Sequence, residues 1–168
     1  MGQTLIVSTE SFSPYKTIAA ALEVAVDGDT IDITGQFQEP VTIAKNIRVR
    51  GQATIFKQPI RVQANVRFEN IHFHSTVTVE QGTPYFANCT FEPTAANALD
   101  IFAPTTFLQC QIRGGDYGIF TKAQTIIQST TIHGATIGLY SQHAAVTVEH
   151  STILDCKKLG ISTIDGEL

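Results

Sequence analysis

The feature that most constrains the fold of this chain is an internal repeat of about 20 residues. Five segments share one order of residue types: apolar, any, small polar, small, any, apolar. They cover residues 68–73, 86–91, 107–112, 127–132 and 148–153, and their first residues lie 18, 21, 20 and 21 positions apart. Short strands that recur with such a period predict a solenoid, in which each strand pairs with its equivalent one coil away.

A second set of segments follows the first with nearly the same period. It covers residues 98–101, 118–121, 138–141 and 160–163. Alternating aliphatic pairs extend both sets toward the N-terminus: Ile31/Ile33, Ile47/Val49, Val41/Ile43, Ile60/Val62 and Val77/Val79. The sequence therefore predicts an all-β fold, a single-stranded right-handed parallel β-helix of about seven coils over about residues 30–164.

Parallel, in-register pairing at about 4.8 Å per coil stacks like residues on like. We expect one inward stack formed by Phe68, Phe86, Phe107, Ile127 and Val148. Asparagine tolerates left-handed backbone geometry, so Asn70 and Asn88 are expected at a corner of the coil.

The first 29 residues depart from the repeat and predict a cap on one single domain of residues 1–168. Pro14 and Thr17 are expected to open a helix that Asp27 and Gly28 end. The predicted apolar face of this helix is Tyr15, Ile18, Leu22, Ala25 and Val26. Such a helix would cover the otherwise open strand edges of the first coil.

The chain resembles the pectin-lyase-like superfamily in three features: this predicted helix, residues 28–31 (Gly-Asp-Thr-Ile) and residues 35–43. Residues 15–51 resemble the opening of pectin methylesterases, and the coils resemble generic β-helix repeats. The resemblance implies the fold. It carries over no catalytic residue, because the aspartate, glutamine and arginine motifs of those enzymes are absent and the acidic residues do not converge. Between residues 40 and 163 the acids are Glu69, Glu80, Glu92, Asp100, Asp116, Glu149 and Asp155.

Composition and the N-terminal sequence limit the possible binding partners and the cellular location of the protein. The formal net charge is -4, which argues against a nucleic-acid binder. No apolar run is long enough for a membrane span. The start lacks a secretory signal, which predicts a cytoplasmic protein, with non-classical export or a removed leader as alternatives. The three cysteines lack metal-ligand spacing, so neither a metal nor a cofactor is expected.

Stacking of the repeat aligns Glu92, Arg113 and His133 on successive coils, with His74 one coil earlier. A carboxylate, a guanidinium and an imidazole in one column would suit binding of a uronate and, in an enzyme, proton transfer by a lyase or epimerase. The alternative is a solvated corner with ordinary surface histidines, and we favour this alternative.

Two further features suggest binding. Phe120 stacks above Tyr140, and alternation favours an outward pair that would bind a sugar or a partner over a pair in the core. Residues 40–68 hold six basic residues and no acid, which suits an acidic polysaccharide. We favour a structural role for these charges, because the repeat places Asp32 beside Arg48 and Arg50 beside Glu69.

The leading functional hypothesis is a non-catalytic structural or binding module. Only five residues follow the last repeat segment, too few to cover a coil, so we expect a homodimer or a protein partner at the C-terminal coil. The alternative is a minimal carbohydrate-active enzyme that acts on a uronate-containing polysaccharide through Glu92, Arg113 and His133.

Overall fold

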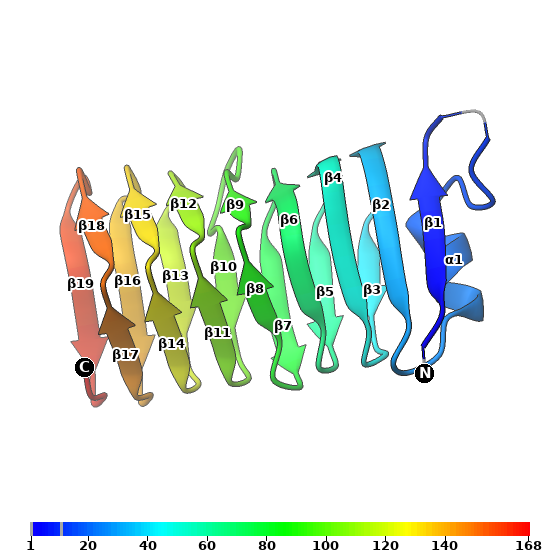
Figure 1. Ribbon diagram of the computed structural model, residues 1–168. Helices are drawn as coiled ribbons and strands as arrows, with labels where there is room; N and C mark the ends of the chain where they lie inside the picture. Colours follow the sequence, from blue (N-terminus) through cyan, green and yellow to red (C-terminus); the bar gives the residue numbers. More distant parts are fainter. Residues whose placement is uncertain (1, 11) are drawn as a thin grey trace.

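The structure, a computed structural model, describes residues 2–10 and 12–168 as a parallel β-solenoid of about seven turns (Figure 1). In Figure 1 the strands of the nearer sheet run upward and those of the farther sheet run downward, while the coils advance from the N-terminal to the C-terminal end. The winding is therefore right-handed. This confirms the fold that the repeat predicts.

The larger sheet, sheet A, has 12 strands, and all of its pairs are parallel. It starts with β1 (Thr4–Ser8) and then takes one long strand from each of three coils: β2 (Thr30–Phe37), β4 (Arg48–Phe56) and β6 (Arg67–Phe73). Each of the next four coils contributes two shorter strands. These are β8 (Tyr85–Ala87) and β9 (Thr90–Phe91), β11 (Thr105–Leu108) and β12 (Gln111–Arg113), β14 (Thr125–Gln128) and β15 (Thr131–His133), and β17 (Val146–Glu149) and β18 (Thr152–Leu154).

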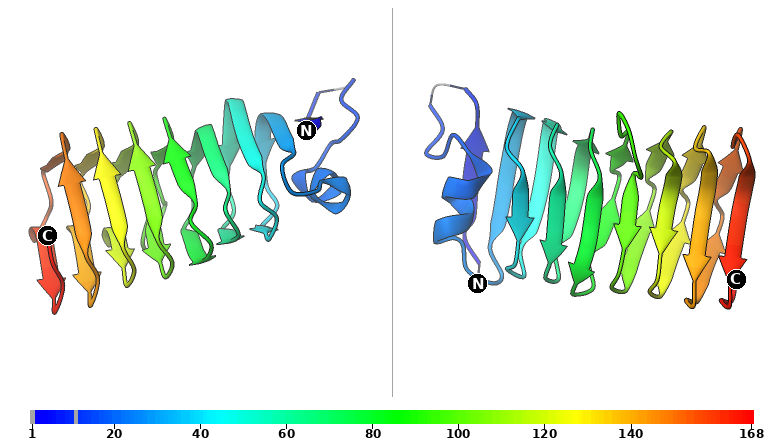
Figure 2. Two further views of the ribbon diagram at one scale, coloured as in Figure 1. Left: turned by 60° about the horizontal axis from the view of Figure 1, so that its bottom comes forward. Right: turned by 180° about the vertical axis from the view of Figure 1, so that it is seen from behind.

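The smaller sheet, sheet B, has seven strands, one from each coil. They are β3 (Val41–Ile43), β5 (Ile60–Gln63), β7 (Val77–Gln81), β10 (Leu99–Ile101), β13 (Tyr117–Thr121), β16 (Ile137–Gln142) and β19 (Leu159–Ile164). The two views in Figure 2 show the coils side by side along one axis, with the helix at the N-terminal end.

The two strands that each later coil gives to sheet A are separated by two residues, and the first residue of each pair has positive φ. These first residues are Asn88 (53°), Gln109 (51°), Ser129 (48°) and His150 (48°). Asn70 has the same conformation within β6 (φ 57°), so the corner expected at Asn70 and Asn88 is confirmed. The bend turns the outer face of β9, β12, β15 and β18 away from that of β8, β11, β14 and β17.

The core is organised around two columns of phenylalanine rings. Phe86 stacks between Phe68 at 4.8 Å and Phe107 at 5.2 Å, with ring planes 4° and 11° apart. In the second column, Phe73 stacks on Phe91 at 5.0 Å. The strand registers continue the first column through Ile127 to Val148. The predicted inward stack is confirmed, and Val148 is only half-buried because it lies in the last coil.

Two elements cover the N-terminal end, and the sequence predicted only one of them. The helix α1 (Ile18–Val24) is capped by Thr17, whose hydroxyl accepts a hydrogen bond from the amide of Ala20. The strand β1, which was not predicted, extends sheet A by pairing with β2.

The predicted helix limits and apolar face were partly wrong. Tyr15 lies before the helix and pairs with Val7, and Val26 lies beyond it with 60% of its surface exposed. Within the described part of the chain, no helix has the length and hydropathy needed to cross a membrane.

Candidate functional site

Three side chains with metal-binding groups meet on the outer face of sheet A. His72 belongs to β6, His74 directly follows it, and Glu92 directly follows β9. Between the histidines, Phe73 points into the core with 1% of its surface exposed, and Phe91 before Glu92 is fully buried. Because side chains alternate along a strand, burial of the two phenylalanines turns the histidines and the glutamate outward.

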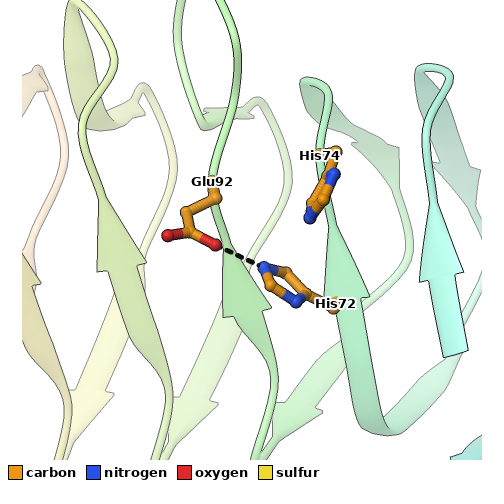
Figure 3. A group of neighbouring side chains, drawn as sticks. All are labelled: His72, His74 and Glu92. Atoms are coloured by element: carbon orange, nitrogen blue, oxygen red, sulfur yellow. Dashed lines mark hydrogen bonds and ion pairs between the residues drawn. The ribbon is translucent and has the colours of Figure 1, made fainter. Parts of the chain in front are cut away.

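Figure 3 shows these three side chains pointing toward one another. The Nε2 atom of His72 lies 2.6 Å from the Oε2 atom of Glu92, and the two imidazole rings are 4.4 Å apart between centroids. On the next coil, Nη1 of Arg113 donates to Oε1 of Glu92 at 3.4 Å. The carboxylate of Glu92 thus has a partner on each side.

Their surroundings shift the pKa of two of these groups. Partial burial lowers the pKa of His74 from its ordinary value of 6.5, and the neighbouring His72 adds to the effect. Partial burial alone would raise the pKa of Glu92, but the hydrogen bonds from His72 and Arg113 outweigh it and the net shift is downward. At neutral pH the site therefore presents an ionised carboxylate next to the neutral imidazole of His74.

The structure brings together only part of the column predicted from the repeat. Glu92 and Arg113 are in contact, and Arg113 pairs with His133 in strand register. His133, however, directs Nε2 toward Oδ2 of Asp155 at 3.3 Å, on the coil farther from Glu92. The column consequently separates into two groups, one around Glu92 and one around His133.

The column predicted from the repeat does not include His72. The signal that could have found it is the sequence His72-Phe73-His74. Two histidines two positions apart on a strand share one face, and a carboxylate 18 residues beyond His74 falls one coil away. Next to His72, the outer face of β4 and β6 forms an open groove of about 520 Å³.

A separate aromatic row lies on the outer face of sheet B. Phe120 and Tyr140 are adjacent in register, with ring centroids 5.6 Å apart and planes 15° apart. Their neighbours Ile119 and Leu139 are fully buried, so the two rings point outward, as the alternation predicted. Tyr117 extends the row by stacking on Tyr140 at 5.2 Å.

The ring geometry affects what this row can bind. Centroids 5.6 Å apart with nearly parallel planes mean that the rings face each other along the solenoid axis. One face of each ring is therefore turned toward its neighbour, and the row as a whole offers apolar contacts on the outer face of sheet B.

The arginines of residues 40–68 are largely neutralised by acids on the same coil or on a neighbouring coil. Glu69 accepts hydrogen bonds from Arg48 at 2.7 Å and from Arg67 at 2.8 Å. The predicted partner of Asp32 was wrong: Asp32 pairs with Arg50 at 2.7 Å, because the β2–β4 register places these two residues side by side. Arg50 does lie next to Glu69 in register, as predicted.

Comparisons with family models, with curated proteins and with solved structures found no match. The parallel β-solenoid is therefore established by the structure itself.

Proposed function

We propose that this protein is a non-catalytic structural module that self-associates through its last coil. The observation that carries the proposal is a concentration of exposed apolar side chains at residues 154–168. They are Leu154 (37% exposed), Leu159 (50%), Ile161 (41%), Ile164 (44%) and Leu168 (63%). Exposed apolar side chains gathered on one coil favour association with another protein surface.

Strand register divides these residues into one that occupies an inward position and others that lie on the outer face. Ile161 is the equivalent of Leu139, which is fully buried, so Ile161 occupies the inward position of β19. Leu159 continues the outward row of Tyr117 and Ile137, and Ile164 lies next to Gln142 on the outer face. The last coil thus adds apolar groups both at the end of the solenoid and beside the aromatic row. We call this surface the C-terminal apolar face, formed by Tyr117, Phe120, Ile137, Tyr140, Leu159, Ile161 and Ile164.

The charges around β19 favour a second copy of the chain as the occupant. Lys157 and Lys158 directly precede β19, whereas Asp165 and Glu167 follow it, and all four are exposed. In an antiparallel pair of two β19 strands, the lysines of each copy lie opposite the acids of the other copy. The pair therefore has one such set of opposite charges at each end. Among the described residues no strand pairs with the outer edge of β19, so its backbone groups are free to do so. A two-fold axis generates this arrangement.

An added charge on the outer face of β19 tests the proposal. Ile164→Lys places an ammonium group in the interface near the lysines of the other copy without entering the core, so we expect the wild-type chain to sediment as a dimer and this variant as a monomer. Val26→Lys is the matched control, because Val26 is also exposed but lies at the opposite end of the solenoid. A dimer that persists in Ile164→Lys and dissociates in Val26→Lys would place the interface at the N-terminal end and refute the proposal.

We further propose that the chain belongs to the pectin-lyase-like superfamily. The right-handed winding, the corner residues with positive φ and the helix at the N-terminal end support this assignment. A crystal structure tests it: its coils should superpose on those of solved superfamily enzymes, and coils of different cross-section would contradict it.

A further inference from the structure

The side chains around Glu92 have the chemistry and spacing of a metal site. One donor atom each from His72, His74 and Glu92 lies within 4.8 Å of the other two. In a tetrahedral site with metal–ligand bonds of about 2.0 Å, neighbouring donor atoms are about 3.3 Å apart. The hydrogen bond of 2.6 Å between His72 and Glu92 needs to open by less than 1 Å, and the wider pairs need to close by at most about 1.5 Å.

The backbone holds these three side chains in place before any ion binds. The amide of His74 donates to the carbonyl of Phe56 at 2.8 Å, and the amide of Glu92 donates to the carbonyl of Phe73 at 2.8 Å. Both ligand-bearing segments are also anchored by buried phenylalanines, Phe73 and Phe91, that stack on each other. Movement of the ligands is thus limited to side-chain rotation.

A further hydrogen bond orients the carboxylate. Arg113 binds Oε1 of Glu92, which leaves Oε2 directed at the histidines. Outer groups of this kind fix the orientation of metal ligands and are part of a functional metal site.

We propose that His72, His74 and Glu92 bind one divalent transition-metal ion of the Zn²⁺ type. Two imidazole nitrogens and one carboxylate oxygen form a donor set of borderline hardness, which suits Zn²⁺ and Co²⁺ better than Ca²⁺ or Mg²⁺. All three residues are half-buried on the outer face of sheet A, and the groove of about 520 Å³ adjoins His72. The remaining coordination positions therefore face solvent and admit water or a small anionic ligand. The site lies on other coils than the C-terminal apolar face, so metal binding at this site does not depend on self-association.

Titration calorimetry with ZnCl₂ on the chelator-treated, tag-free chain tests the site. We expect one ion per chain with a dissociation constant of micromolar or below. Loss of an outer partner costs 10- to 100-fold in metal affinity, so loss of a ligand in His74→Ala or Glu92→Gln should cost at least 100-fold. His133→Ala is the matched control, because His133 is a histidine on the same face that pairs with Asp155 outside the site; its affinity should equal that of the wild type.

Two outcomes would overturn the proposal: no saturable binding below 1 mM Zn²⁺, or equal affinities for wild type and His74→Ala. Circular dichroism checks that each variant keeps its strand signal. Should a variant fail to fold, imidazole NMR signals of the wild type decide the question. Zn²⁺ should shift the signals of His72 and His74 and leave those of His133, His143 and His150 in place, whereas shifts at the latter three alone would refute the site.

Discussion

Replacing Phe86 by alanine removes the ring at the centre of the core. Phe86 stacks on Phe68 and Phe107 and makes edge contacts with Phe91 at 5.4 Å and Phe73 at 6.2 Å. It is fully buried. Each of its four partners belongs to its own coil or to an adjacent one, so the substitution weakens the contacts that join three coils.

The expected loss follows from the packing. A Phe→Ala substitution in a core costs about 3 to 5 kcal/mol through lost transfer free energy and the cavity that remains. Because four aromatic contacts are lost together, and each such pair contributes roughly 0.5 to 1.5 kcal/mol beyond its buried area, we expect about 5 kcal/mol, at the upper end of that range. For a chain of this length this corresponds to a fall in Tm of about 10 to 20 °C.

Urea unfolding followed by circular dichroism measures the loss, and Phe102→Ala is the control. Phe102 is 47% exposed and contacts Phe120 edge-on at 6.2 Å, so its removal should cost about 1 kcal/mol or less. If the two variants lose equal free energy of unfolding, the aromatic columns do not hold the coils together and the reasoning is refuted.

Two further predictions concern charge and activity. Glu69 has a pKa below its ordinary 4.5, chiefly because of the hydrogen bond from Arg48, so this stabilisation is present at neutral pH and is lost as the pH falls through the folded-state pKa. Glu69→Gln should therefore lower the free energy of unfolding by about 1 kcal/mol at pH 7 and by progressively less as the pH falls below 4.5, whereas the exposed control Glu23→Gln should match the wild type throughout; a gap that stays constant would contradict the assignment. The purified protein should neither cleave nor de-esterify pectin, polygalacturonate or alginate, with or without calcium, and turnover that disappears in Arg113→Ala or His133→Ala would reverse this expectation.

The sequence predicted the parts of the fold that repeat. Phe68, Phe86 and Phe107 recur with one period, and parallel pairing allows only one way to stack them. Asn70 and Asn88 were assigned to a corner by their tolerance of left-handed geometry. The sequence did not predict β1, because Thr4–Ser8 has no equivalent within the repeat. The pairing of β1 with β2 also depends on the chain returning past α1.

The sequence predicted only part of the candidate site, because the direction of each side chain decides which residues meet there. Glu92 and Arg113 were aligned correctly, since both directly follow a buried residue of equivalent strands. His72 was missed because it lies within its strand, not after it, and only its outward direction brings it to Glu92. The pairing of Asp32 was misassigned by two residues, since a column alignment does not specify which arginine within a strand faces an acid one coil away.

If two copies join through antiparallel β19 strands, variants with complementary charges should pair with each other, and a mixing experiment tests this. Lys157→Glu/Lys158→Glu replaces both lysines that directly precede β19 by acids, and Asp165→Asn/Glu167→Lys removes both acids that follow it, with an asparagine that tolerates the positive φ at position 165. Sedimentation velocity should then find a wild-type dimer of twice 18.2 kDa, each variant alone as a monomer, and an equimolar mixture of the two variants as a dimer. A wild-type chain that stays monomeric at high micromolar concentration, or a mixture that does not dimerise, would show that β19 does not join two copies.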